Sequence, residues 1–272
     1  MKNRSPSSAR RANTLARALL VCLLLTGTWL NAAQLQEIRV TQVVNDVNLA
    51  SAAVPRRVAV GERLRDGDAI NTGITGRSEL TFANQTIARL GAKTNISVSD
   101  ETRTIDLAEG AVLFQIPEGA GRLKLKTAAI ALVSTGATAI IERHGEFYVK
   151  VLVLEGTVRC YLTNRLGESL LVQPGQILIT KPDNPALSEP ADFDIAREMK
   201  TCLLVREFQP LPSQRLIEFE ERNQLKLIAK GKYIPSNLVI FGRGTQVTLV
   251  NAPSTTPPSK PATNIGHQSN AP

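Results

Sequence analysis

Short β-prone runs alternate with glycine-containing turns along residues 38–180. Polar and apolar side chains take alternate positions in three of these runs, residues 78–82, 86–90 and 122–126. An alternation of period two places one face of a strand on a core and the other face in water. The turns recur at intervals of roughly 8–12 residues, which is typical of sandwiches and barrels. A longer and more apolar run, residues 146–154, is expected in the middle of a sheet.

The same region lacks helical periodicity. No stretch of about ten residues repeats apolar side chains three and four positions apart, which argues against parallel βαβ units. We therefore predict an all-β fold, an antiparallel sandwich or jelly-roll-like β domain over residues 38–180. A short helical C-terminal extension and a disordered tail are expected to follow it.

Glycines punctuate the first part of this region at positions 61, 67 and 73. Asp66-Gly67 is a strong tight-turn dipeptide, because glycine accepts a positive φ and aspartate bonds its own backbone. Asp66 and Asp68 also suggest calcium, but a calcium loop supplies several more oxygen ligands at fixed spacing. We predict structural turns at Asp66, Gly67 and Gly73, and no metal site.

Two Glu-Gly segments repeat a short pattern. Residues 107–112 (LAEGAV) and 153–158 (VLEGTV) each predict a strand, a turn at Gly110 or Gly156, and a second strand. Two such hairpins suit a sandwich built from two related halves. Chance similarity is the alternative, because the motif is short.

A series of motifs keeps a fixed order and spacing from Gly61 onward. The motifs are Gly61-Glu62-Arg63-Leu64, Asp66-Gly67-Asp68-Ala69-Ile70, Thr72-Gly73, Arg77-Ser78-Glu79-Leu80-Thr81-Phe82, Leu90-Gly91, Leu107-Ala108-Glu109-Gly110, Gly136-Ala137-Thr138-Ala139 and Leu154-Glu155-Gly156-Thr157-Val158. The series resembles the FecR domain family over roughly residues 38–180. The resemblance implies an extracytoplasmic β domain. The best-known members are transmembrane regulators of iron uptake, in which this domain receives a signal from an outer-membrane transporter and a cytoplasmic N-terminal segment controls a sigma factor.

The N-terminus has the pattern of a secretory signal peptide. Residues 2–17 are basic and serine-rich, residues 18–30 are uncharged and apolar, and small residues follow up to Ala33. The apolar run is shorter than the about 20 residues of a membrane-spanning helix. We predict a signal peptide over residues 1–33 and a periplasmic or secreted mature chain. A retained signal anchor is the alternative, and only then would the chain contact the membrane.

The polar stretch before the apolar run has only about 17 residues. That is too few for a folded cytoplasmic regulatory domain. We therefore expect a stand-alone secreted FecR-domain protein that lacks the sigma-regulator segment.

Beyond Lys181 the composition changes. Prolines at 182, 185 and 190 predict a linker over residues 181–191. A helix capped by Asp192 is expected next, and its apolar positions are Phe193, Ala196, Met199 and Leu203. A second helix is expected between Ser213 and Gly231, with apolar positions at Leu216, Phe219, Leu227 and Ile228.

The last part of the chain turns polar. Strand-like runs at residues 238–241 and 246–250 complete an extension over residues 192–250. Residues 251–272 are rich in Pro, Ser, Thr and Asn and have almost nothing to bury. We expect this tail to be disordered.

Composition supports a packed core. Of 272 residues, 43 % are hydrophobic and 21 % are charged, which argues against wholesale disorder. The formal net charge of +8 suggests nucleic acid, yet five of the 32 basic residues fall in the first 17 positions, which hold no acid. The rest of the chain carries 27 basic minus 24 acidic residues, or +3. Aromatics, at 4 %, leave little to stack on bases, so no nucleic-acid partner is expected.

Candidate chemistry is sparse. His144 is the only histidine outside the tail, and we interpret it as a solvated side chain at a hairpin tip. Neither a phosphate-binding glycine loop nor a nucleophile elbow is present. We predict a non-enzymatic protein with no catalytic residues, no metal ligands and no cofactor. Cys160 and Cys202 are interpreted as two small buried hydrophobes, and a disulfide between them is the alternative.

A basic strand is the one candidate binding feature. Arg122, Lys124 and Lys126 alternate along residues 122–126 and should share the outer face of their strand. They could meet an acidic partner. The alternative, favoured by the near balance of charge, is a face that keeps the protein soluble or protects a sheet edge.

The leading functional hypothesis is a non-enzymatic, extracytoplasmic binding or signal-relay module that acts through protein–protein contacts with an envelope protein. The alternative is a structural protein of the cell envelope that binds peptidoglycan or another anionic cell-wall polymer. That alternative rests on the secretory leader, the basic strand and a tail long enough to reach across the envelope.

Overall fold

We describe the chain from a computed structural model, which covers residues 37–50, 55–99, 102–163, 165, 167–233 and 235. The predicted signal peptide, the strand-like runs at 238–241 and 246–250, and the predicted tail at 251–272 lie outside these residues. Among the described residues, no helix is long and apolar enough to span a bilayer.

The strands form two sheets. In spatial order, sheet A contains β4 (Arg63–Leu64), β1 (Ile38–Val44), β6 (Arg77–Phe82), β7 (Ile87–Leu90), the second half of β9 (Thr104–Ile116), β12 (Ala137–His144), β13 (Tyr148–Gly156), β16 (Gln176–Thr180) and β17 (Ala191–Asp192). Sheet B contains β3 (Arg56–Arg57), β2 (Val47–Leu49), β5 (Ala69–Thr72), β8 (Asn95–Ser99), the first half of β9, β10 (Leu123–Lys126), β11 (Ile130–Ser134), β14 (Val158–Leu162) and β15 (Ser169–Val172).

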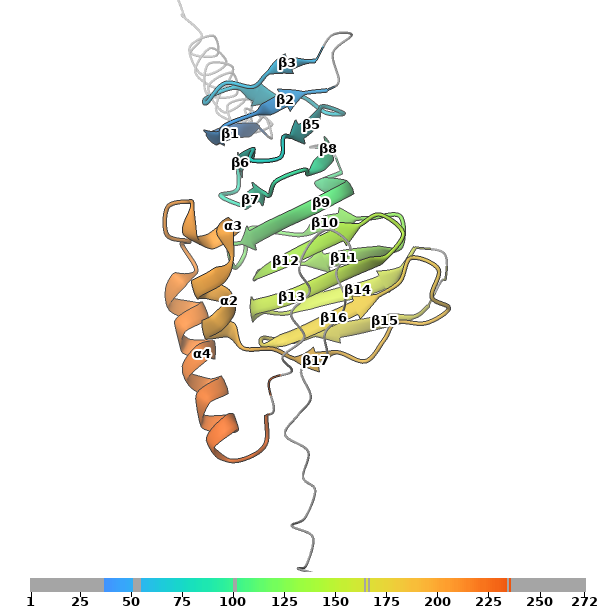
Figure 1. Cartoon of the computed structure of the whole chain (residues 1–272), viewed down its shortest axis with the longest axis vertical. Coiled ribbons are helices and arrows are strands. Elements are labelled where there is room, and N and C mark those ends of the chain that lie inside the picture. The colour runs from blue at the N-terminus through green and yellow to red at the C-terminus, as the bar shows by residue number, and fades with distance from the viewer. Residues whose placement is uncertain are drawn as a thin grey trace, which may run out of the picture.

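The two sheets stack face to face, and their strands follow one another along the length of the molecule (Figure 1). All the pairings are antiparallel except that of β9 with β10. The prediction of an all-β fold with a short helical extension is confirmed. The long apolar run at 146–154 is also where we expected it, since β13 lies between β12 and β16 inside sheet A.

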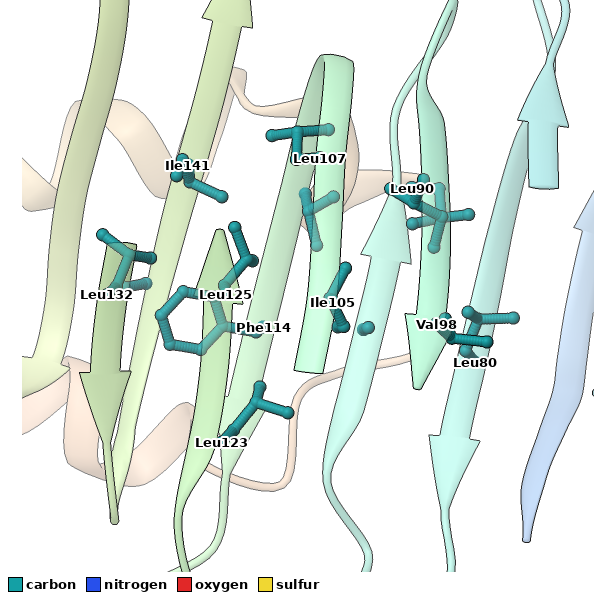
Figure 2. Packing of buried hydrophobic residues seen from close by; sticks show 14 of the residues in the cluster. Leu80, Leu90, Val98, Ile105, Leu107, Phe114, Leu123, Leu125, Leu132 and Ile141 are labelled. Carbon is teal, nitrogen blue, oxygen red and sulfur yellow. The ribbon is translucent and has the colours of Figure 1, made fainter. Parts of the chain in front are cut away.

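The core between the sheets is aliphatic. Side chains from both sheets meet there, as Figure 2 shows for Leu80 and Phe114 of sheet A and for Val98, Leu125 and Leu132 of sheet B. Each of these five is at most 2 % exposed. Burying one such side chain contributes about 1.5–3 kcal/mol, so alternation at these positions is enough to fix which face of each strand points inward.

The Glu-Gly segments are not hairpins, and that part of the prediction is wrong. Strand β9 runs through Gly110 and passes from sheet B into sheet A, pairing with β8 on one side of this residue and with β12 on the other. Gly156 ends β13 in sheet A, and β14 then starts in sheet B. Both glycines have positive φ, +95° and +72°. Each segment is therefore a change of layer, which explains why the two sequences look alike.

Three helices cover part of the outer face of sheet A: α2 (Ile195–Thr201), α3 (Leu203–Arg206) and α4 (Gln214–Ala229). A second apolar core fills the space between them and the sheet. Its buried members are Leu113, Ile140, Leu152, Leu154 and Ile177 from the strands and Phe193, Ile195, Leu204, Phe208, Leu211 and Ile217 from the extension. Strand β13 is buried on both faces for this reason.

The first helix begins later than predicted. Asp192 lies in β17, and Asp194 is the N-cap, whose carboxylate accepts a hydrogen bond from the Arg197 N–H at 3.0 Å. The pairing of β17 with β16 keeps residue 192 extended, so the carboxylate that caps the helix is the next one along the chain.

The predicted apolar side of the second helix is not its buried side. Ile217 and Gln224 of α4 are buried, whereas Leu216, Phe219 and Leu227 are 41–57 % exposed. Gln224 explains the orientation, because its amide donates to the Phe193 carbonyl at 2.7 Å and accepts from the Ile195 N–H at 3.1 Å. Hydrogen bonds to the start of α2 thus set the rotation of α4.

The two cysteines lie in different cores. Cys160 is buried between the sheets, and Cys202 packs in the core beneath the helices. Both are free thiols, and burial raises the pKa of each to about 12. They therefore behave as small apolar side chains.

Candidate functional site

The predicted basic strand is β10. Leu123 and Leu125 are 2 % exposed and face the core. Lys124 and Lys126 are half-buried on the outer face of sheet B, and Arg122 is exposed just before the strand. Because β10 lies between β9 and β11, it is an interior strand, and these cations do not protect a sheet edge. That part of the alternative interpretation is wrong.

Two depressions flank the lysines, and Lys124, Lys126 and Asp106 line both. One, of about 610 Å³, extends over β11 and β14 towards Val133 and Tyr161. The other, of about 450 Å³, extends over β8 and is lined by polar residues that include Ser97, Ser99 and Thr102. Asp106 lies opposite Lys126 in the ladder of β9 with β10. The surface therefore offers two ammonium groups, the Arg122 guanidinium, the carboxylates of Asp66 and Asp106, one phenol ring and several hydroxyls.

Beyond β8, the outer face of sheet B continues as a row of asparagines. Asn48, Asn71 and Asn95 lie opposite one another across β2, β5 and β8. The Asn71 Oδ1 is buried and has no hydrogen-bond partner within the described residues. Amides and hydroxyls in this arrangement suit hydroxyl-rich or amide-bearing ligands.

The predicted turns are tight backbone features. At Asp66-Gly67 the Asp68 N–H donates to the Arg65 carbonyl at 3.0 Å, the Arg65 N–H donates to the Asp68 carboxylate at 2.8 Å, and Gly67 has φ +81°. The Gly73 N–H donates to the Asp46 carbonyl at 2.8 Å. In the described parts of the chain, no group of three or more His, Cys, Asp or Glu side chains is placed to hold a metal ion.

His144 is at the tip of the β12–β13 hairpin but is less solvated than expected. Its Nδ1 lies 3.7 Å from the Glu109 carboxylate, and its ring stacks on Phe147 and Tyr148. Glu109 also accepts from the Gly145 N–H at 2.8 Å. The carboxylate comes from the point where β9 changes sheets, so spacing along the chain gave no sign of the pair.

A polar row crosses the outer face of sheet A where the helical cover begins. Gln115, Thr138 and Glu155 are opposite one another on β9, β12 and β13, and all are at most 6 % exposed. Thr138 donates to Glu155 Oε1 at 2.6 Å, and Ser213, which precedes α4, lies 2.6 Å from the Thr138 hydroxyl. Since an ionised Glu155 takes the single Thr138 proton, Ser213 donates to Thr138.

This row borders a cavity of about 740 Å³. The walls come from the end of β9 and the loop after it, from the β11–β12 and β13–β14 turns, and from the start of α4. Burial raises the pKa of Glu155, the Thr138 hydrogen bond opposes this rise, and the nearby Glu220 carboxylate adds to it. Sequence reasoning missed the site because its parts come from four separated segments.

Residues 68–159 match the family model described as FecR protein. This segment of the chain is similar to the FecR domain family. The matched segment runs from β5 to the start of β14 and includes β9, β10 and β13. The strands outside the match, β1–β4 and β15–β17, extend both sheets beyond the matched segment.

Two crystal structures are similar to this chain, each of a "putative anti-sigma factor" from Parabacteroides distasonis ATCC 8503. One shares 18 % identity over 57 % of this chain and 75 % of its own, with a TM-score of 0.44. The other shares 14 % identity over 52 % of this chain and 75 % of its own, with a TM-score of 0.40. No curated protein matches the sequence.

A buried arginine fastens the extension to the β domain. Arg89 on β7 is 1 % exposed, and its Nε donates to Glu79 at 2.9 Å. Its two terminal nitrogens donate to the Leu204 and Gln209 carbonyls at 3.1 and 2.5 Å, and the guanidinium lies 4.9 Å from the centre of the Phe208 ring. This contact and the Ser213–Thr138 bond hold the helices on sheet A and leave the Lys124 and Lys126 face of sheet B open.

Proposed function

We propose that this chain is a non-enzymatic, extracytoplasmic binding or signal-relay module of the FecR-domain type, and that it acts through contacts with an envelope protein. The partner surface is the outer face of sheet B around Arg122, Lys124 and Lys126. The observation that carries the proposal is the pair of open depressions that share Lys124, Lys126 and Asp106 on that face. The secretory pattern of residues 1–33 supports a periplasmic location.

The outer faces of the two sheets differ in how far they are covered, and this difference supports the choice of surface. Helices α2–α4 cover part of the outer face of sheet A through the second apolar core. On sheet B, two lysines and Tyr161 stand beside grooves. Aromatic side chains such as Tyr161 are enriched in protein interfaces, and positive charge steers the approach of an acidic partner.

Site-specific crosslinking in cells tests the proposal. A photoreactive amino acid at position 124 should capture one discrete protein, because Lys124 lies between the two grooves. The same amino acid at the exposed position 41, on the outer face of sheet A, is the control. Capture of nothing at 124, or of the same species with equal yield at both positions, would contradict the proposal.

Binding of an anionic cell-wall polymer is the second candidate. The row of asparagines beside the lysines favours it, because amides and ammonium groups together suit an acidic polysaccharide. Sedimentation with purified envelope polymer should be lost when Arg122, Lys124 and Lys126 are changed to Glu. The control changes three exposed residues to Glu, namely Arg222 and Lys226 of α4 and its C-cap Lys230, so net charge falls equally. Equal sedimentation of both variants would exclude this role.

A further inference from the structure

The cavity beside α4 is lined by acidic and neutral residues. Its polar side chains include Glu155, Glu118, Gln115 and Ser213, and among the described lining residues there is no Lys or Arg. Arg215 is exposed in the first turn of α4 but does not line the cavity. Gly136 and Gly156 form another part of the wall.

Two buried groups in this lining lack full compensation. Gln115 is 3 % exposed, and its Oε1 has no hydrogen-bond partner among the described residues. An unsatisfied buried acceptor costs about 1–3 kcal/mol. Glu155 is 6 % exposed and accepts from Thr138 but has no cation among the residues that line its cavity.

We propose that this cavity binds a guanidinium or ammonium group, contributed by an arginine or lysine side chain of a partner protein. The cation would donate to the Glu155 carboxylate and to the Gln115 oxygen. Such a pair is stronger than one in water, because the site is largely removed from solvent. This inference rests on the proposed function, since it names the chemistry of one contact between this chain and a partner protein.

The rim of the cavity favours a protein side chain over a free small cation. Leu216 lines the cavity and is 57 % exposed, and Phe219, one helical turn further along α4, is 53 % exposed. Apolar side chains three positions apart share one face of a helix. A peptide whose basic residue enters the cavity can therefore place neighbouring apolar residues against α4, whereas a free cation gains nothing there.

Isothermal titration calorimetry of small probes with the full chain tests the electrostatic part of the proposal. N-acetylarginine amide should bind at least tenfold more tightly than N-acetylcitrulline amide, which has nearly the same shape and no charge. The variant Glu155→Gln should lose at least tenfold in affinity for the arginine probe. Glu189→Gln, an exposed change away from the cavity lining, should not. Equal binding of both probes, or unchanged binding by Glu155→Gln, would overturn the proposal.

A second pair of measurements tests the protein origin of the cation. Acetyl-Arg-Leu-Leu amide should bind more tightly than N-acetylarginine amide, and Leu216→Ser with Phe219→Ser should remove that gain. If the peptide binds no better than the single residue, the natural ligand is a small cation, and the proposal that a partner protein supplies it is wrong. Gln115→Met keeps the side-chain length, removes the amide oxygen and should weaken binding of the arginine probe. This variant provides the test if Glu155→Gln fails to fold. The crosslinking at position 124 is independent of all these outcomes.

Discussion

Arg89 places a full positive charge in a position that is 1 % exposed. Arg89→Ala should lower the free energy of unfolding by about 3–5 kcal/mol, because it removes the cation beside the half-buried Glu79 carboxylate and the donor to two carbonyls. Urea unfolding measures this change. Desolvation lowers the pKa of Arg89 and the Glu79 partner opposes the effect, which is consistent with a charge held in place by its contacts.

An exposed arginine provides the matched control. Arg39 pairs with Glu37 at 2.6 Å, but its side chain is 47 % exposed. Arg39→Ala should therefore cost no more than about 1 kcal/mol. Similar losses for the two variants would show that the Arg89 contacts do not fasten the extension.

Glu155 makes stability depend on pH in a defined direction. Burial raises its pKa in the folded protein, so the folded state holds its proton more tightly than the unfolded chain, whose carboxyl titrates near about 4.3. Stability is lost as pH rises from that value through the folded pKa, because the buried group must then ionise. The melting temperature of Glu155→Gln minus that of the wild type should increase between pH 4 and pH 8. A constant difference would contradict the burial argument.

At the scale of elements, the buried face of each strand could be predicted from the sequence because alternation is a local pattern. Leu123 and Leu125 face inward and Lys124 and Lys126 face outward as the sequence predicts. The partners of a strand are not local, so the Glu-Gly segments were misread as hairpins. The orientation of α4 was misread for a related reason, since the polar Gln224 takes a buried position through bonds to residues 193 and 195.

Gly110 is a position inside a strand where a side chain does not fit. A Cβ there would lie 2.4 Å from Thr94 Oγ1 and 2.5 Å from Thr94 Cα, at φ +95°. Gly110→Ala should cost more than about 2 kcal/mol in chemical denaturation, because strain of the backbone adds to the clash. Gly119 has φ +76° and nothing within 4 Å of a Cβ, so Gly119→Ala should cost only the backbone part. If the two variants lose equal stability, the clash with Thr94 makes no contribution and the prediction is wrong.

At the scale of the whole molecule, the helical extension covers an apolar face of the β domain. Truncation after Asp192 removes the helices and uncovers Leu113, Ile140, Leu152, Leu154 and Ile177. This variant should bind a hydrophobic dye several-fold more strongly and self-associate, because exposed apolar patches drive association. Truncation after Pro235 keeps both cores and should behave like the full chain. Equal dye binding by the two would contradict the role of the extension.

The two candidate sites differ in how visible they were in the sequence. Arg122, Lys124 and Lys126 are neighbours on one strand, so their shared face followed from alternation alone. Gln115, Thr138, Glu155 and Ser213 meet only because two strands change layers and a later helix folds back onto sheet A. No local pattern marks any of these side chains as part of a site, because only the assembled fold brings them together around the cavity.

Strand β9 has thirteen residues and belongs to both layers, because it changes sheet at Gly110. Asp106, before this point, lines the grooves of sheet B, and Gln115, beyond it, lines the cavity beside α4. Nine residues of chain separate them, a span of at most about 30 Å. The two candidate sites, on opposite faces of the molecule, therefore share one continuous backbone segment.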